Sequence, residues 1–254
     1  VVHSHILKQQ TVITGYFYIQ FGRIATLSSV PMARRKSLAF LDVGQGDCFV
    51  ADTKSGAIIF DGGSSSEDQV GRYRILPYMK YLGYQKIQIA VISHMDIDHY
   101  SGIKELLEMG KIKYLGLPEI PKDETMKKII GIAKKRGTTI FYLSRGRQIT
   151  TKDGSLKVLH PQKNSQMEKN AASLVMQGKI LGYRVLLTGD VEKEGEEELL
   201  SEELERADIL KAAHHGSKNS TSNEFLQKVQ PKQTVISCGK QNRYGHPHLE
   251  TIHR

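Results

Sequence analysis

A six-residue segment, His94-Met-Asp96-Ile-Asp98-His99, constrains this chain more than any other feature. It follows the apolar run of residues 87–92, which has the length and composition of a buried strand. Two imidazoles and two carboxylates therefore alternate at a strand end, where a tight loop can turn them onto one centre. Nitrogen and oxygen ligands of this kind suit Zn²⁺, Mn²⁺ or Fe²⁺ rather than a thiolate-rich site. The segment predicts a metal site.

The alternative is a polar loop that leads into a helix over residues 101–108, with Asp98 or Ser101 as its N-cap. Capping uses one such side chain. It does not explain two histidines and two aspartates in alternation, so we favour the metal site.

Length and composition indicate a globular protein with a sizeable core. The chain has 254 residues, of which 39% are hydrophobic and 25% charged. We predict an N-terminal extension of unknown structure over residues 1–36 and one domain over residues 37–254, whose final helix is truncated. The uncharged stretch 11–22 is too short and too polar to span a bilayer, and we recognise no signal peptide. We expect Cys48 and Cys238 to be buried free thiols.

The net charge of +9 favours an anionic partner, with nucleic acid as the leading candidate. A basic protein without such a partner is the simpler alternative. Many cationic residues fall in predicted loops that border the metal motifs, and they predict a basic substrate groove: Arg72, Arg74, Arg145, Arg147, Lys152, Lys163, Lys169, Lys218, Lys240 and Arg243.

Strand-like and helix-like segments alternate along the chain without repeats. This order, with polar residues at strand ends, predicts an α/β sandwich. The expected strands are 37–43, 48–51, 56–60, 87–92, 112–117, 139–143, 156–159, 172–176, 183–187, 208–213 and 233–238. The expected helices are 77–82, 101–108, 125–135, 192–205 and 223–229.

Three further strand ends carry residues that bind metals. Asp190 follows one strand through a Gly turn, His214 and His215 follow the next, and His246 and His248 follow the last. Each pair alone could be an exposed polar loop. Four such strand ends in one chain indicate one shared site.

These motifs resemble those of the metallo-β-lactamase fold superfamily and, within it, the soluble domain of the ComEC family of competence proteins for DNA internalisation. The matching stretches run from about residue 38 to 248 in the family's order: 40–47 (FLDVGQGD), 60–63 (FDGG), 93–99 (SHMDIDH), 170–175 (NAASLV), 187–190 (LTGD), 210–217 (LKAAHHGS) and 242–247 (NRYGHP).

The resemblance implies an αββα sandwich with two divalent metal ions between its sheets, and phosphodiester hydrolysis on DNA. It also implies a parent protein in the cell membrane that carries this soluble domain on its extracytoplasmic side. Single-stranded and duplex DNA both remain candidate substrates, and no oligomeric state is indicated.

The resemblance also assigns metal ligands. His94 and Asp96 would hold the first metal, and Asp98 and His99 the second. Asp190 would bridge the two ions, and His214 would complete the second site.

Two positions depart from the superfamily's pattern. Asp96 stands where the superfamily more often has His, and Asn170 stands about where its third histidine for the first metal belongs. His160 also lies upstream of Asp190, but its spacing does not match the position of that third histidine. An oxygen-rich first site favours Mn²⁺ over Zn²⁺, or an empty site.

The chemistry assigns catalytic roles as well. Two cations can activate a shared water and stabilise charge on the phosphoryl group, with Asp98 and Asp190 holding them. We expect His215 or His246 to protonate the leaving oxygen, and Asp61 to orient a ligand imidazole.

Three further residues are candidates for orienting ligands or contacting substrate. Asp47 flanks a Gly-rich turn that either faces the substrate or forms a simple tight hairpin. Asn170 and Ser217 complete this group.

Two other functions fit the sequence. One is hydrolysis of a small phosphodiester, such as a choline phosphate ester, in a closed and less basic pocket. The other is a DNA-binding module whose metal site no longer turns over, a reading that Asn170 suggests.

Overall fold

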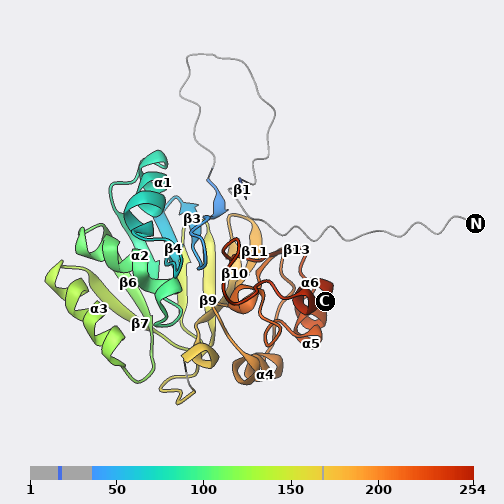
Figure 1. The fold of residues 1–254 in the computed structure, drawn as a ribbon. Coiled ribbons are helices and arrows are strands. Elements are labelled where there is room, and N and C mark those ends of the chain that lie inside the picture. The colour runs from blue at the N-terminus through green and yellow to red at the C-terminus, as the bar shows by residue number, and fades with distance from the viewer. Residues whose placement is uncertain (1–16, 19–35, 168) are drawn as a thin grey trace, which may run out of the picture.

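The computed structural model describes residues 17–18, 36–167 and 169–254. Two sheets face each other, and helices cover the outer face of each (Figure 1). The predicted αββα sandwich is confirmed. Among the residues outside the description are most of the predicted extension, 1–16 and 19–35. Residues 17 and 18 form a short strand, and the proposed boundary at residue 37 stays a prediction.

The first sheet has seven strands in the order of the chain. Neighbouring strands are antiparallel from β1 to β4 and parallel from β4 to β7. The strands are β1 (Phe17–Tyr18), β2 (Leu38–Phe40), β3 (Phe49–Thr53), β4 (Gly56–Phe60), β5 (Ile87–Val91), β6 (Ile112–Pro118) and β7 (Thr139–Leu143). The carboxyl ends of the parallel strands β4 and β5 therefore meet at one edge, where residues 61 and 93–94 follow them.

The second sheet has six strands in the order β13-β12-β11-β10-β9-β8. Strands β11, β12 and β13 are parallel, and the rest of the sheet is antiparallel. The strands are β8 (Gln148–Thr151), β9 (Gly154–His160), β10 (Val175–Ile180), β11 (Tyr183–Leu187), β12 (Ile209–Lys211) and β13 (Gln233–Val235). Its parallel strands end at the same edge of the sandwich as β4 and β5, and this brings distant motifs together.

Three apolar layers hold the sandwich together. One lies between the first sheet and its helices, where Ile59 and Leu115 pack with Leu106 and Ile129. A second fills the space between the sheets, with Phe60, Val91 and Leu187 among its members. A third lies beneath the helices of the second sheet and includes Leu210 and Phe225. Buried apolar surface on both faces of each sheet explains why the strands read as continuous hydrophobic runs.

The helices divide between the two sheets (Figure 1). Helices α1 (Leu76–Tyr81), α2 (Ile97–Glu108) and α3 (Glu124–Lys135) cover the first sheet, and α4 (Lys193–Ser201), α5 (Asn223–Val229) and α6 (Leu249–His253) accompany the second. No helix in the described residues is long and apolar enough to cross a membrane.

Most predicted elements are present, and the differences have local causes. The strand expected over 172–176 starts only at Val175, because Lys169–Ala172 form a 3₁₀ turn. The strand β8, polar except for Ile149, was not predicted. Helix α2 begins four residues earlier than expected, at Ile97, inside the metal motif. Both cysteines are free thiols, and only Cys48 is fully buried.

Candidate metal centre

The motif of residues 94–99 spans a strand end and a helix start. His94 lies two residues beyond Ile92, and His99 lies in the first turn of α2; both side chains are buried. The residue that precedes the helix is Asp96, and its side chain makes no capping hydrogen bond. Asp98 and Ser101 lie within the helix, so the alternative in which one of them is the N-cap is wrong.

Asp61 holds His99 in one orientation. It lies at the end of β4, fully buried, with a positive φ of 58°. One carboxylate oxygen accepts a hydrogen bond from the Ser93 backbone N–H at 2.7 Å, and the other lies 3.0 Å from His99 Nδ1. With Nδ1 directed at Asp61, the Nε2 atom of His99 faces the space between the sheets. This is the contact that a carboxylate makes when it orients a ligand imidazole, as predicted for Asp61.

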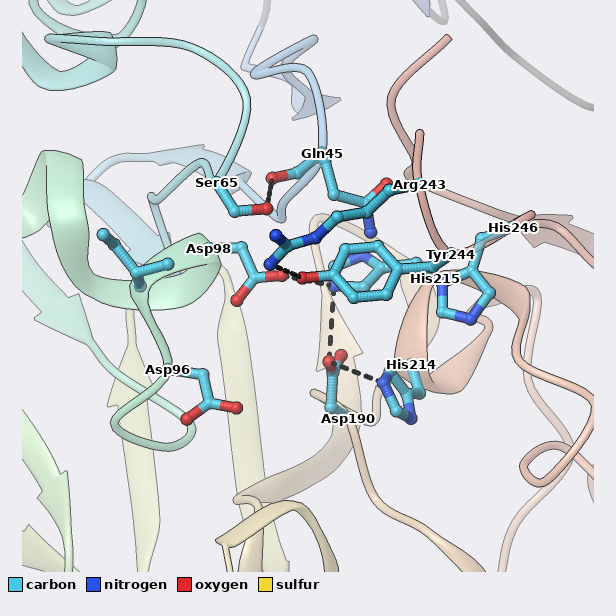
Figure 2. Close-up of a pocket in the computed structure, with 11 residues that line it drawn as sticks. Gln45, Ser65, Asp96, Asp98, Asp190, His214, His215, Arg243, Tyr244 and His246 are labelled. Atoms are coloured by element: carbon cyan, nitrogen blue, oxygen red, sulfur yellow. Dashed lines mark hydrogen bonds and ion pairs between the residues drawn. The ribbon is translucent and has the colours of Figure 1, made fainter. Parts of the chain in front are cut away.

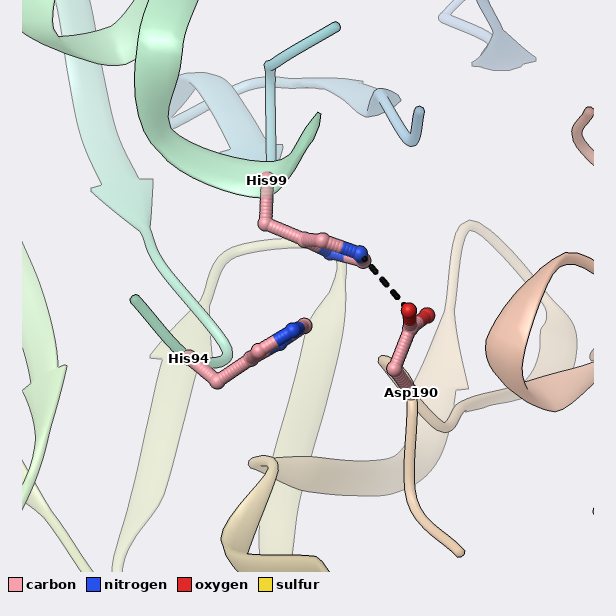
Figure 3. A group of neighbouring side chains, drawn as sticks. All are labelled: His94, His99 and Asp190. Carbon is pink, nitrogen blue, oxygen red and sulfur yellow. Dashed lines mark ion pairs between the residues drawn. The ribbon is translucent and has the colours of Figure 1, made fainter. Parts of the chain in front are cut away.

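Asp190 joins the two halves of the site. It follows β11 through a Gly turn, and its Oδ2 atom lies 3.2 Å from His99 Nε2 and 3.3 Å from His215 Nε2. His94 lies beside His99, with ring centroids 4.1 Å apart, and its Nδ1 contacts the Ser93 hydroxyl at 3.0 Å. Figure 3 shows three side chains converging: His94 from the loop after β5, His99 from helix α2 and Asp190 from the turn after β11. One potential ligand atom from each lies within 4.8 Å of the other two.

His215, not His214, completes the buried cluster. His215 Nε2 lies 3.3 Å from Asp98 Oδ2, and its Nδ1 lies 2.9 Å from the Ser237 carbonyl oxygen. His214 is 23% exposed; its Nδ1 lies 2.9 Å from Glu192 Oε1, and its Nε2 is 3.9 Å from Asp190. The geometry therefore favours His215 as a ligand over the predicted His214.

The reason is local backbone conformation. In a strand, successive side chains point to opposite faces, but this rule does not apply to the pair. Strand β12 ends at Lys211, and both histidines adopt left-handed backbone angles in the turn Ala213–Gly216.

The two aspartates of the motif differ in their surroundings. Asp98 takes part in a group of potential ligands with His99 and His215. Asp96 is 44% exposed, and its carboxylate lies 3.8 Å from His94 Nε2 at the rim of the site. Its assignment to the first metal stays a prediction.

A buried ion pair lies behind His215. Lys211 Nζ lies 2.5 Å from Asp47 Oδ2 and donates to the Ala212 carbonyl oxygen, and both side chains are almost fully buried. Asp47 Oδ1 is 3.4 Å from His215 Nδ1. Asp47 therefore faces the cluster from the Gly-rich turn. The turn also requires glycine at position 46, since a Cβ there would lie 2.2 Å from the Gly63 carbonyl oxygen.

The pKa values of the cluster are shifted by burial and by neighbouring charges: that of His94 is lowered, and those of His99 and His215 are raised. Burial and the neighbouring His99 lower the pKa of His94 to about 3. Burial also disfavours the charged form of His99 and His215, but Asp190 and a second carboxylate beside each ring outweigh it and raise both pKa values. Asp190 has a pKa far below its usual range despite burial, because His215 and His99 stabilise its charge. Such opposed shifts are typical of functional sites.

The donor set fits a metal centre. The Nε2 atoms of His94, His99 and His215 and the Oδ1 atom of Asp190 are buried without a hydrogen-bond partner. Leaving such atoms without hydrogen bonds costs free energy in a folded protein, and cations bound between them would satisfy them. Imidazole nitrogen with carboxylate oxygen is the set that Zn²⁺, Mn²⁺ and iron accept.

A pocket opens from this cluster to the surface (Figure 2). It has a volume of about 240 Å³. Its walls come from both sheets: Gln45, Ser65, Asp96, Ile97, Asp98, Asp190, His214, His215, Arg243, Tyr244 and His246. His246 contributes an imidazole 5.4 Å from the ring of His214.

Three other residues singled out from the sequence belong neither to this lining nor to the buried cluster. His160 is buried, with Nε2 2.7 Å from the Ala171 carbonyl oxygen and Nδ1 3.3 Å from Glu198, so it links β9 to α4. Asn170 has a buried, unpartnered Oδ1 but does not line the pocket. Ser217 supports the histidine turn, because its N–H donates to the His214 carbonyl oxygen at 2.8 Å.

Sequence reasoning missed several residues that shape the site. Glu192 contacts His214, Tyr244 and Gln45 line the pocket, and Lys211 neutralises Asp47. Of these residues, only Lys211 could have been recognised from the sequence. A lysine within the buried run 209–213 is almost never found without a partner, so it predicts a buried carboxylate beside it. Of the ten basic residues that predicted a substrate groove, Arg243 alone belongs to this pocket's described lining. The basic groove stays a prediction.

Several known proteins have sequences related to this chain, and a competence protein is among them. The chain is 37% identical to ComE operon protein 3 of Bacillus subtilis over 84% of this chain and 29% of that protein. It is 30% identical to competence protein ComA of Neisseria gonorrhoeae over 81% of this chain and 27% of that protein. Recombination protein 2 of Haemophilus influenzae is 29% identical over 84% of this chain and 26% of its own length. The chain thus spans less than a third of these relatives, and the resemblance to the ComEC family is confirmed.

Solved structures share the fold at low sequence identity. The metallo-β-lactamase fold protein YhfI of Bacillus subtilis matches with a TM-score of 0.55 and 14% identity, over 84% of this chain and 92% of that one. The diiron β-hydroxylase CmlA of Streptomyces venezuelae matches with a TM-score of 0.51 and 12% identity, over 86% and 49%. The model of the metallo-β-lactamase superfamily matches residues 41–240, which contain the whole buried cluster. Sequence, fold and the convergence of its ligand motifs agree, and this chain belongs to the metallo-β-lactamase superfamily.

Proposed function

We propose that this domain is a metal-dependent phosphodiesterase that cleaves DNA during DNA uptake. The observation that carries the proposal is the set of four buried, unpartnered ligand atoms on His94, His99, Asp190 and His215. Proteins of this superfamily are typically metal-dependent hydrolases. The competence proteins that match the chain support DNA as the substrate, and its net charge of +9 favours a polyanion.

Two groups of residues would hold two divalent cations. His94 and Asp190 would bind the first with Asp96 at the rim, and Asp98, His99 and His215 would bind the second with Asp190 shared. Once bound, the cations would activate water and stabilise charge on the phosphoryl group. We expect Mn²⁺ or Zn²⁺, and the carboxylates of the set favour Mn²⁺.

The chain's own residues would orient this centre and the substrate. Asp61 fixes the ring of His99, and the Asp47–Lys211 pair borders His215. Burial and His214 lower the pKa of His246 to about 4, so its imidazole is neutral at pH 7. A neutral imidazole suits hydrogen bonding to the substrate better than the predicted donation of a proton to the leaving oxygen.

The length of the relatives supports a larger setting for the domain. Since the chain covers 29% of ComE operon protein 3, we propose that it belongs to a longer membrane protein. The domain would act there on the extracytoplasmic side, where incoming DNA is met.

A metal titration with three substrates tests the proposal. Purified protein is treated with chelator and dialysed, and Mn²⁺, Zn²⁺ or Mg²⁺ is added back to single-stranded DNA, duplex DNA or bis(p-nitrophenyl) phosphate. We expect cleavage of DNA only with added metal, and most rapidly with Mn²⁺. Robust cleavage in excess chelator would contradict the metal dependence.

The same experiment separates the alternatives. Hydrolysis of the small diester without cleavage of either DNA would indicate a small-molecule phosphodiesterase. Binding of DNA without cleavage under any metal would indicate a binding module. Either result would overturn the proposed nuclease.

A further inference from the structure

One wall of the pocket is a loop organised around a single amide. The side chain of Asn242 donates to the carbonyl oxygens of Gly239 at 2.8 Å and His246 at 2.6 Å. Its Oδ1 accepts from the backbone N–H groups of Tyr244 at 3.1 Å and His246 at 3.0 Å. Gln45 accepts from the Gly239 N–H at 3.0 Å and so ties the loop to the Gly-rich turn. The residues carried by this loop are therefore held in position before any substrate arrives.

The loop presents Arg243 and Tyr244 as a joined pair. Arg243 Nη2 donates to the Tyr244 hydroxyl oxygen at 2.7 Å, and its guanidinium carbon lies 4.9 Å from the centroid of that ring. Tyr244 also stacks on His246, with centroids 5.7 Å apart and an angle of 22°. Figure 2 shows the guanidinium and the hydroxyl meeting beside Asp98 at the mouth of the pocket.

No described carboxylate lies within ion-pair distance of Arg243; the Tyr244 hydroxyl and, more weakly, the Asp98 carboxylate raise the pKa of its guanidinium. Among the ion pairs of the described residues, Arg145 and Arg184 have carboxylate partners and Arg243 has none. The Tyr244 oxygen accepts its hydrogen bond from Arg243, so the hydroxyl hydrogen is free to point into the pocket. The pair thus offers a guanidinium fork and one hydroxyl donor to an anion beside the metal centre.

We propose that Arg243 and Tyr244 form a subsite for the phosphate next to the scissile one in a bound DNA strand. This inference rests on the proposed function. It adds that substrate selection at this site depends on the negative charge of a neighbouring phosphodiester. The exposed position of both side chains at the pocket mouth, rather than at its base with Asp190, points to a neighbouring phosphate.

Binding measurements without metal test the subsite apart from catalysis. Fluorescein-labelled 12-mer single strands are titrated with protein in chelator, and affinity is read from anisotropy. Arg243→Gln should weaken binding by about 10- to 100-fold, because a charge-assisted hydrogen bond is lost. Tyr244→Phe should weaken it by about two- to tenfold.

Matched controls remove general effects of charge and of surface tyrosines. Arg136→Gln changes net charge by the same amount at the exposed end of α3, away from the pocket, and should leave affinity unchanged. Tyr73→Phe removes a hydroxyl from a tyrosine that is 63% exposed and should also have no effect. Equal effects of Arg243→Gln and Arg136→Gln would overturn the subsite. Circular dichroism checks that each variant is folded.

Neutral phosphate analogues identify the contact. In a series of strands with one methylphosphonate each, the metal-loaded wild type should lose cleavage when the phosphate beside the cut is neutral. The Arg243→Gln variant should cleave the strand with the neutral phosphate beside the cut as rapidly as it cleaves the unmodified strand. A variant as sensitive to the analogue as the wild type would refute the assigned contact.

The outcomes distinguish the proposed subsite from the proposed nuclease activity on which it rests. Arg243-dependent binding without cleavage under any metal would keep the subsite and overturn the nuclease. Cleavage that does not depend on Arg243 would keep the nuclease and overturn the subsite. If the metal-free wild type binds no strand, the subsite is overturned, and the cleavage assay with added metal decides the nuclease separately.

Discussion

The two imidazole pairs of the site are built in different ways. His94 and His99 come from the first sheet, are 2% and 0% exposed, and have Ser93 and Asp61 as buried partners. His214 and His215 come from the second sheet, where only His215 is buried and His214 extends to Glu192. In the first pair, His94 lies in the bend after β5 and His99 lies in the first turn of α2. The second pair lies in a left-handed turn.

The difference shows where a motif can be interpreted without a structure. A strand that leads directly into a helix limits where the side chains between them can point, and the resemblance assigned the roles of the first pair. A left-handed turn has no such rule, and neighbouring elements determine which imidazole is buried. Asp190 contacts both pairs and is the residue on which they depend equally.

Loss of Asp190 should have the largest effect, because both halves of the site depend on it. We expect Asp190→Asn to lower metal-dependent hydrolysis by about 10³-fold or more, as for a member of a catalytic unit. Metal content by mass spectrometry should fall as well. Asp68→Asn, which changes an exposed carboxylate, is the control. Wild-type rates in a folded Asp190→Asn protein would show that the shared carboxylate is another residue.

Breaking the buried pair behind the second half should destabilise the fold. Lys211→Met leaves the buried Asp47 without its ammonium partner, and we expect a loss of about 3–5 kcal/mol in the free energy of unfolding. The double variant Asp47→Asn with Lys211→Met should recover part of it. Denaturant titration of metal-free protein measures both. An unchanged midpoint in Lys211→Met would mean that the pair carries no net stability.

The same pair has a defined dependence on pH. The pKa of Asp47 falls from 3.8 to about 2 in spite of its burial, owing to Lys211 and His215. A carboxyl whose pKa is lower in the folded state contributes stability above its unfolded value and loses it as pH falls through the folded value. The stability gap between the wild type and Lys211→Met should therefore narrow between pH 3.8 and about 2.

The two neighbouring histidines should differ in metal affinity. Loss of a residue that only orients a ligand lowers metal affinity by about 10- to 100-fold, and His215→Ala removes a buried ligand atom itself. We therefore expect His215→Ala to weaken metal binding by about 100-fold or more. His214→Ala should have the smaller effect on metal and act mainly on rate. Isothermal titration with Mn²⁺ compares the two variants. If His214→Ala is the one that no longer binds metal, the original assignment of His214 is restored.

The smallest effects should come from helix caps, one on each side of the sandwich. Asp123 accepts from the Met126 N–H at the start of α3, and Ser222 accepts from the Phe225 N–H at the start of α5. Alanine at either position should cost about 1 kcal/mol of stability. Metal affinity should not change in either variant. A change confined to Ser222→Ala would show that the second half of the site depends on the packing of its helix.

Much of the fold could be predicted from hydrophobic runs. The strands over 56–60, 139–143 and 183–187 and the helix over 223–229 have the predicted bounds. Polar strands such as β8 give no such signal, since their pairing partner rather than their composition makes them strands.

The sequence by itself determined the ligand types and the strand ends that carry them. Carboxylates and imidazoles are recognisable as residues, and parallel strands end at a common edge. It did not determine which of two adjacent histidines is buried, that Lys211 neutralises Asp47, or that Arg243 and Tyr244 meet over the pocket. The contacts that fix His215 and the Gly-rich turn join residues far apart in the chain, such as His215 with Ser237, 22 positions away, and Ser237 with Gly46, 191 positions away. Only tertiary packing decided them, because no local periodicity relates residues so distant in the chain.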